Sequence, residues 1–244
     1  MALERPLEAE FRFLDGGGGW STTTLGKVAG AEVVRGGPVR SLPTYRGQRN
    51  YPGLLWTATT QSLVGYESLL ERDRLWLADF DPSVRWVASQ PFWLSGRDGP
   101  SRRRHVPDFL LEAADGGYTV VDVKPKDMLV EPAVVEVLAW TGRLCSAKGW
   151  AYEVWHGEDP VLLRNVRFLA AGRRLAFVDE TARVKVAEAC AAGMTVAQVE
   201  AAVELEPAVA RVAVLSLLWF GHVTTDLTRP LSASSVLEPS VAAA

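Results

Sequence analysis

The sequence is poor in the residues that build disulfides and zinc sites. It contains only two cysteines, Cys145 and Cys190, which lie far apart and belong to no CxxC motif. This spacing excludes a disulfide framework and a zinc site. The three histidines, at positions 105, 156 and 222, are too far apart to predict a metal site, so we expect structural or surface roles for them. Such a cysteine content favours a reducing cytoplasm.

Long apolar runs and an excess of positive charge are also missing. The longest run rich in apolar residues, 212–220, is far shorter than the roughly 20 residues that a membrane-spanning helix needs. The amino terminus, MALERPLEAEFRF, has no apolar core of the kind found in secretory signals, so we expect neither export nor a membrane span. The formal net charge of −3 means that any contact with nucleic acid must come from a local basic patch.

The sequence does contain enough apolar residues for packed cores, since 48% of it is hydrophobic. Scattered glycines and prolines over residues 1–50 predict an irregular N-terminal arm. An α/β domain is expected over 51–160. A rise in alanine and the loss of alternating strands then predict a small, mostly helical domain over 161–230. Residues 231–244, rich in Ser, Ala and Pro, predict a mobile tail.

Residues 51–160 carry the pattern of a mixed α/β domain, with a helix before the strands and a second helix crossing one face of the sheet. Stretch 96–103 has the composition of a turn, and Asp115-Gly116-Gly117 predicts a hairpin between the two strands that flank it. The expected elements are a helix over 64–77, strands over 84–89, 92–95, 105–112 and 118–124, a helix over 132–147 and a strand over 151–155.

The later domain has the element order of a winged helix. Helices are expected over 181–192, 196–203 and 207–220, followed by a short strand over 222–226. The third helix carries Arg211 as its only base, and residues 161–244 contain eight basic and eight acidic residues, so we do not expect this helix to bind phosphates. Its apolar character suits either a protein partner or the core of the domain itself.

Several acids and a lysine can converge in the α/β domain. Asp122 and Lys124 are two residues apart in an expected strand, so their side chains leave on one face. Asp108, on the other strand of the hairpin, can lie beside Asp122. Two like-charged carboxylates favour a cation between them, and Mg²⁺ held by carboxylates near a lysine suits phosphodiester hydrolysis. Glu67, near the start of the first helix, can supply a third carboxylate.

Each of these features also has a less specific interpretation. An isolated Asp108 or Asp122 is more often a turn or surface acid. Near Glu67, Glu71 and Asp73 are alternatives whose other role is a solvated helix face. It is the order and placement of the acids and the lysine together that favour a nuclease.

A basic run precedes Asp108. Arg102, Arg103 and Arg104 can grip DNA phosphates, or they can belong to a solvated hairpin turn. Lys126 has the same two interpretations.

The motifs VPD at 106–108 and VDVK at 121–124 resemble the signature of PD-(D/E)xK nucleases. The segments GYES at 65–68 and LERD at 70–73 resemble, in particular, the TnsA-type transposase endonuclease subunits. The likeness covers roughly residues 40–230. It implies a restriction-endonuclease-like core followed by a winged-helix-like domain.

The resemblance also implies roles for individual residues. Glu67, Asp108 and Asp122 would bind Mg²⁺, with Mn²⁺ as a substitute, and Lys124 would position or activate the attacking water. Relatives carry an amide or a glutamate at the position of Asp122. Gln90, in Ser89-Gln90-Pro91, would lie close to the site.

In its functional context, the resemblance implies a double-stranded DNA substrate and cleavage at the 5′ ends of a transposon. An integrase-type transposase subunit would cut and join the 3′ ends, and an AAA+ ATPase would regulate the assembly. The later domain would recruit the partner. Two alternatives remain: a stand-alone restriction, phage or defence nuclease of the same fold, and a non-catalytic scaffold that binds DNA or a partner. The absence of neighbouring genes for a transposase and an ATPase would indicate the first alternative, the stand-alone nuclease.

Overall fold

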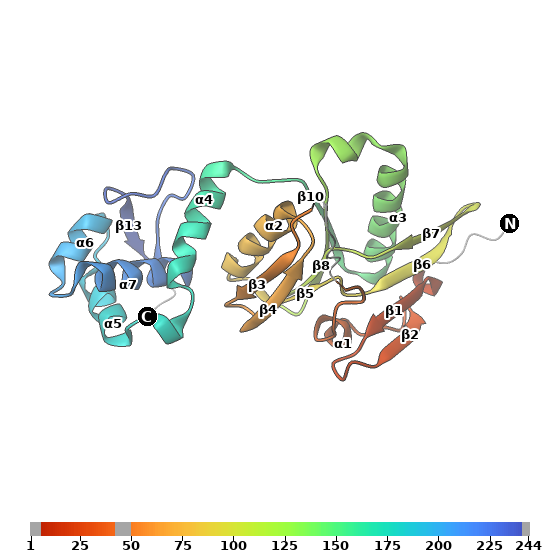
Figure 1. The fold of residues 1–244 in the computed structure, drawn as a ribbon, viewed down its shortest axis with the longest axis horizontal. Helices are drawn as coiled ribbons and strands as arrows, with labels where there is room; N and C mark the ends of the chain where they lie inside the picture. The colour runs from red at the N-terminus through yellow and green to blue at the C-terminus, as the bar shows by residue number, and fades with distance from the viewer. Residues whose placement is uncertain (1–5, 42–49, 241–244) are drawn as a thin grey trace. The chain divides into compact units, whose positions relative to one another are not determined.

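The chain divides into two units, Met1–Gly157 and Glu158–Ala244. The computed structural model describes residues 6–41 and 50–240 (Figure 1). The first unit contains three sheets and three α-helices among its described residues, and the expected mixed α/β class is confirmed. In neither described stretch does a helix have the length and apolar character that crossing a bilayer requires.

The central sheet of the first unit has the strand order β10-β9-β8-β5. Its strands are β5 (Val84–Ser89), β8 (Phe109–Ala113), β9 (Tyr118–Val123) and β10 (Ala151–Trp155). Strands β8 and β9 form the expected antiparallel hairpin, whereas β10 pairs with β9 in parallel. A parallel pair needs a crossover, and helix α3 (Pro132–Lys148) provides it. Pro132 opens this helix and Gly149 ends it with a φ of 80°, as their backbone preferences predict.

Successive residues of the central strands alternate between two hydrophobic cores, as the period of a β-strand dictates. Leu110 and Val120 face the core that includes α3, while Phe109 and Val121 face the core beneath helix α2 (Leu69–Phe80). The sheet is therefore covered on both faces.

The first helix begins later than expected. The prediction of a helix from residue 64 was wrong, because Ser62–Tyr66 is strand β4, which pairs with β3 (Gly53–Thr57). Helix α2 starts at Leu69 because the side chain of Ser68 caps it, its Oγ accepting a hydrogen bond from the backbone N–H of Glu71 at 3.1 Å.

A second four-stranded sheet, with the order β2-β1-β6-β7, shows that the expected irregular arm over 1–50 was wrong for residues 6–41. Its strands are β1 (Glu10–Leu14), β2 (Trp20–Thr24), β6 (Trp93–Asp98) and β7 (Ser101–His105). A short 3₁₀ turn, η1 (Pro6–Glu8), precedes β1, and helix α1 (Gly30–Val34) follows β2. The glycines that suggested an irregular segment form the β1–β2 turn, where Gly18 has a φ of 79°.

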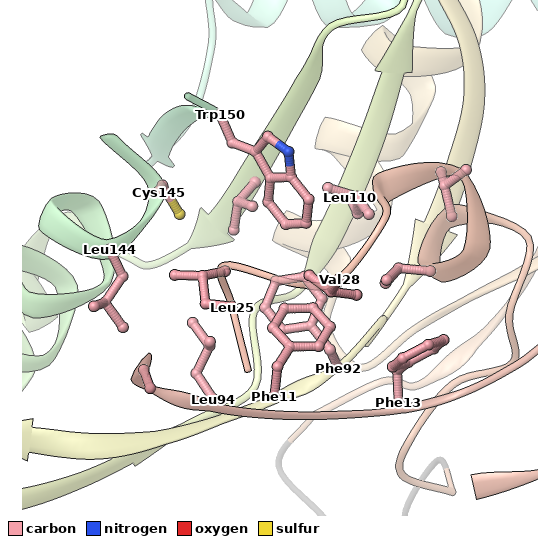
Figure 2. Close-up of a cluster of buried hydrophobic side chains, with 14 of the residues drawn as sticks. Phe11, Phe13, Leu25, Val28, Phe92, Leu94, Leu110, Leu144, Cys145 and Trp150 are labelled. Atoms are coloured by element: carbon pink, nitrogen blue, oxygen red, sulfur yellow. The ribbon is translucent and has the colours of Figure 1, made fainter. Parts of the chain in front are cut away.

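The N-terminal hairpin contributes to the main core. Phe11 and Phe13 are buried and lie in one cluster with Phe92 and Trp150 (Figure 2). The ring centroids of Phe11 and Phe92 are 4.3 Å apart. Burial of aromatic rings on this scale makes the hairpin an integral part of the first unit. Positions 1–5 and 42–49 of the expected arm lie outside the described residues.

The stretch expected to be a turn, 96–103, is mostly strand. Strands β6 and β7 form a hairpin whose turn is confined to Gly99 and Pro100, with Gly99 at a φ of 61°. The expected single strand over 105–112 is also wrong, because β7 ends at His105 and β8 begins at Phe109. Pro107 lacks the backbone N–H that a continuous strand needs.

The second unit is a helical domain with a small sheet of order β11-β13-β12. Its helices are α4 (Pro160–Leu169), α5 (Glu180–Ala189), α6 (Val196–Ala202) and α7 (Pro207–Trp219), and its strands are β11 (Met194–Thr195), β12 (Val223–Thr224) and β13 (Val236–Pro239). Two 3₁₀ turns, η3 (Ala170–Gly172) and η4 (Leu175–Phe177), join α4 to α5. Residues 213–219 of α7 are all buried, so this helix forms the core of its own unit.

The expected mobile tail over 231–244 was wrong for its described part. Strand β13 pairs with both β11 and β12, and Leu237 is buried. The side chain of Asn165 fixes the segment before it, donating to the carbonyls of Leu227 and Arg229 and accepting from the N–H of Leu231. The polar composition of the segment hid this long-range anchoring. Positions 241–244 lie outside the described residues.

Candidate active site

The ends of β8 and β9 bring Asp108, Asp122 and Lys124 together. The Lys124 ammonium lies 3.1 Å from Oδ2 of Asp108 and 3.9 Å from Oδ1 of Asp122. The backbone N–H of Val123 also donates to Oδ2 of Asp108 at 2.6 Å. The motif residues thus converge at one end of the central sheet, as their positions on the hairpin predict.

Asp122 is held by two side chains that were not assigned to the site. Tyr152 donates its hydroxyl proton to Oδ2 of Asp122 at 2.5 Å, and Nε2 of His105 lies 2.8 and 2.9 Å from the two carboxylate oxygens. Asp122 has no exposed surface. Both of its oxygens are therefore engaged, which suits a positioning role.

One contact of Asp122 comes from the second sheet and the other from an adjacent strand of the central sheet. His105 ends β7, and Tyr152 lies on β10, which pairs with β9. Burial and the charge of Asp122 raise the pKa of Tyr152 well above its ordinary value, so the hydroxyl stays protonated and can donate. No spacing in the sequence indicates this arrangement, because it depends on how two sheets pack.

The charge of Asp108 acts on Glu71, one of the alternatives to Glu67. Glu71 is buried at the first turn of α2, where it accepts hydrogen bonds from the N–H of Glu67 at 2.7 Å and the hydroxyl of Ser68 at 2.8 Å. Burial and the charge of Asp108 raise the pKa of Glu71 to about 7. Glu71 is therefore a candidate for the carboxylate role that the sequence analysis gave to Glu67.

Glu67 has a different partner. Its carboxylate lies 3.3 Å from the guanidinium of Arg40. Because it precedes the Ser68 cap, Glu67 is not in the helix at all. The choice of Glu67 followed from placing the helix start too early.

Negative charge exceeds positive charge in this cluster. Burial alone would lower the pKa of Lys124, but Asp108, Asp122 and Glu71 raise it overall, so the ammonium stays charged. Burial raises the pKa of Asp108, and Lys124 offsets this only in part. Three carboxylates near one ammonium leave a deficit of about two positive charges when all are ionised, and a divalent cation would supply them.

The donor set fits Mg²⁺ or Mn²⁺. Within residues 6–41 and 50–240, no three Asp, Glu, His or Cys side chains are grouped so that they alone could hold a metal. Magnesium, however, is usually bound by one or two carboxylates, with water and substrate phosphates completing its shell. Asp108 and Glu71 have the chemistry for this and each keeps some exposed surface, whereas Asp122 has none.

Gln90 adds a buried polar group beside the site. Its backbone N–H donates to the carbonyl of Asp108 at 2.9 Å, and its φ of 46° is rare for a residue other than glycine. Among the described atoms, neither end of its buried amide has a hydrogen-bond partner. A buried amide without a partner is costly, so its position next to Asp108 fits a site that is completed by a bound group.

Comparison with protein families gives an independent assignment. Residues 81–156 match the family model described as TnsA-like endonuclease N terminal. This segment is similar to part of the TnsA-like endonuclease N-terminal domain. No curated protein gives a significant match to the chain.

The TnsA-like segment covers the central sheet but not the whole first unit. It includes Asp108, Asp122 and Lys124, and it ends directly after β10. The match is shorter than the likeness expected over 40–230. Glu71 on α2 and the N-terminal strands β1 and β2 precede it, so their roles rest on the structure.

The expected DNA-binding residues of the TnsA-like domain have different surroundings. Arg103 pairs with Asp98 and Glu136, both at 2.8 Å. Arg104 stacks on a tryptophan ring, and Arg102 is exposed. Lys126 is exposed on the 3₁₀ turn η2 (Lys126–Val130). The basic run is thus split between opposite faces of β7.

The raised pKa of Glu71 predicts a pH-dependent stability in the absence of metal. Folding raises this pKa from 4.5 to about 7, so the folded first unit binds a proton that the unfolded chain releases. The contribution of Glu71 to the free energy of unfolding is fully present below pH 4.5. It is lost as the pH rises through 7, and the loss is on the order of 3 kcal/mol.

Glu71→Gln, which resembles the protonated form, should therefore be more stable than the wild type at pH 8 in EDTA and similar to it at pH 4.5. Urea unfolding at both pH values measures this difference. The same stability difference at the two pH values would contradict the assigned environment of Glu71.

Proposed function

We propose that this chain is a Mg²⁺-dependent DNA endonuclease that cleaves the 5′ ends of a transposon as one subunit of a heteromeric transposase. The family match makes it a nuclease related to transposase subunits. The observation that carries the proposal is the contact of Lys124 with Asp108 at 3.1 Å, in a cluster where the charge of Glu71 also acts on Lys124. This arrangement has the components that phosphodiester hydrolysis requires.

Asp108 and Glu71 would hold the metal. Their charges repel each other in a buried place, as the raised pKa of Glu71 reflects. When bound, the metal would lower the pKa of water and offset the charge that develops on the phosphoryl oxygens. Glu67, assigned to this role from the sequence, would instead support the loop before α2 through Arg40.

Lys124 would act as a fixed cation at the reacting phosphate. Its pKa is raised by the surrounding carboxylates, so it keeps its proton and can donate hydrogen bonds to a water or a phosphoryl oxygen. Asp122 would position Lys124 from 3.9 Å, held in turn by His105 and Tyr152. In this proposal Asp122 is a positioning residue rather than a ligand.

The second unit would recruit a protein partner. Its order of helices and strands, with the β12–β13 pair after α7, supports a winged-helix-like assignment. Because α7 is buried in its own unit, the contact would be made elsewhere. Leu175 and Phe177 on η4 are 48% and 78% exposed, which suits contact with an apolar surface. The integrase-type transposase and its AAA+ regulator are the proposed partners.

Metal-dependent cleavage tests the proposal. The full chain, with and without an integrase-type transposase subunit, should cut a duplex that carries the transposon end in Mg²⁺ or Mn²⁺. Calcium should bind without supporting turnover, because its looser coordination sphere positions water poorly. Strand-resolved gels identify the cut ends.

Efficient cleavage of specific sequences by the chain alone would favour a stand-alone nuclease. Absence of cleavage with the partner in both Mg²⁺ and Mn²⁺ would favour the non-catalytic scaffold.

A further inference from the structure

The sheet β2-β1-β6-β7 has one buried and one exposed face. Phe11, Phe13 and Leu94 point into the core, and their neighbours along the strands point outward because successive side chains alternate. Arg12 and Arg104 are exposed on the outer face. The pairing of Gly96 with Arg103 and of Ser95 with Arg104 places these two adjacent arginines on opposite faces.

Tryptophan and arginine alternate across the outer face, one from each strand. From β2 to β7 they are Trp20, Arg12, Trp93 and Arg104. The guanidinium of Arg12 lies 4.1 Å from the ring centroid of Trp20, and that of Arg104 lies 3.8 Å from the ring centroid of Trp93. Arg12 and Trp93 are direct cross-strand partners. This row is called the Trp–Arg row below.

Stacking prepares these arginines for an anionic ligand. A guanidinium that lies flat on an aromatic ring keeps its N–H edge free and loses less side-chain entropy when it binds a phosphate. Among the described residues, neither Arg12 nor Arg104 has a carboxylate at ion-pair distance, whereas Arg103, on the other face, has two. Arg102 is also exposed on β7, two residues from Arg104.

The charge of this face differs from that of the chain. The outward positions of the four strands include Arg12, Arg102 and Arg104, with Glu10 as the one acid among them. The whole chain has a net charge of −3. A local positive face on an acidic protein is the electrostatic complement of a polyanion.

We propose that the Trp–Arg row binds the phosphate backbone of double-stranded DNA. This inference rests on the proposed nuclease function and adds the surface that holds the substrate. The stacked arginines cover tryptophan faces that would otherwise be available to bases, which favours a duplex backbone over single-stranded bases. Strand β7 carries Arg104 directly before His105, which contacts Asp122, so the surface and the site share one strand.

Fluorescence anisotropy with a labelled duplex of mixed sequence, in EDTA at several salt concentrations, tests the proposal on the full chain. Arg12→Gln and Arg104→Gln should each weaken binding roughly eightfold at 0.1 M salt, because one lost phosphate contact removes about 0.9 from the slope of log K against log salt. The double variant should lower the slope by about two. Melting curves verify that the variants are folded.

Arg35→Gln is the matched control. Arg35 also stacks on a tryptophan, Trp86, at 3.8 Å, but it pairs with Glu112 and lies outside this sheet. The change removes the same charge and a similar stacking contact, so duplex affinity and salt slope should stay as in the wild type. An equal loss in Arg35→Gln, or wild-type binding by the double variant, would overturn the proposal.

The outcomes separate this inference from the nuclease proposal. If the wild type binds through the Trp–Arg row but never cleaves, the nuclease proposal fails and the surface stands. A different result would make the Trp–Arg row a protein-docking surface. In that case the wild type cleaves normally, and the double variant binds DNA normally but no longer responds to the transposase subunit. This inference would then fail.

Discussion

Replacing Lys124 with alanine is expected to lower the rate of DNA cleavage by about 10²–10³-fold, the effect of removing one preorganised charge from a transition state. Lys124 is the only cation among the side chains shown to contact Asp108, and its ammonium lies 3.1 Å from that carboxylate. The loss should appear in the single-turnover rate constant at saturating Mg²⁺. Duplex affinity should fall by no more than the loss of one phosphate contact, because the Trp–Arg row carries the other proposed backbone contacts.

Lys185→Ala provides the control for this experiment. Lys185 is an exposed lysine of α5 in the second unit. Its replacement removes the same charge and should leave the cleavage rate within about twofold of the wild type, as is usual for a surface change. A folded Lys124→Ala protein that cleaves at nearly the wild-type rate would show that Lys124 is only a structural charge.

Glu71→Gln is expected to reduce cleavage by about two orders of magnitude or more, whereas Glu67→Gln should reduce it little. The two residues are four positions apart and undergo the same chemical change. Glu71 is buried and its pKa is raised by the charge of Asp108, while Glu67 pairs with Arg40. The amide keeps the size of the side chain but removes the negative charge that attracts a divalent cation.

Cleavage rates over a series of Mg²⁺ concentrations provide the measurement. Glu71→Gln should also require more Mg²⁺ for half-maximal activity. The opposite ranking, with Glu67→Gln inactive and Glu71→Gln active, would restore the assignment made from the sequence and remove Glu71 from the site.

The parts of the fold that sequence patterns predicted depend on local signals. Strand β5 and strand β10 were expected at the bounds they have, and α3 was expected to within one residue. Their valines, a proline at the first helical turn and a glycine at the end of the helix act within a few residues. The Asp108, Asp122 and Lys124 cluster was predictable for the same reason, since one hairpin carries all three.

The parts that sequence patterns missed depend on packing between distant segments. The hairpin β1–β2 is short and rich in glycine, and it is stabilised by the burial of Phe11 and Phe13 against residues some 80 positions later. The contact of His105 with Asp122 requires two sheets to meet, and that of Tyr152 requires the parallel pairing of β10 with β9. Glu67 was expected in the first helix although Ser68 and Glu71 have the spacing of a capping box, which indicates a helix that begins after Ser68.

Calorimetric titration of Mn²⁺ into the full chain at pH 8 tests most directly whether Asp108 and Glu71 build a divalent-metal site. The wild type should bind metal, and Asp108→Asn should lose that binding, while Glu67→Gln should match the wild type. Asparagine preserves the size of the side chain and an oxygen that can accept from the N–H of Val123, so the change removes charge with little loss of packing. Equal Mn²⁺ binding by the wild type and a folded Asp108→Asn protein would contradict the account.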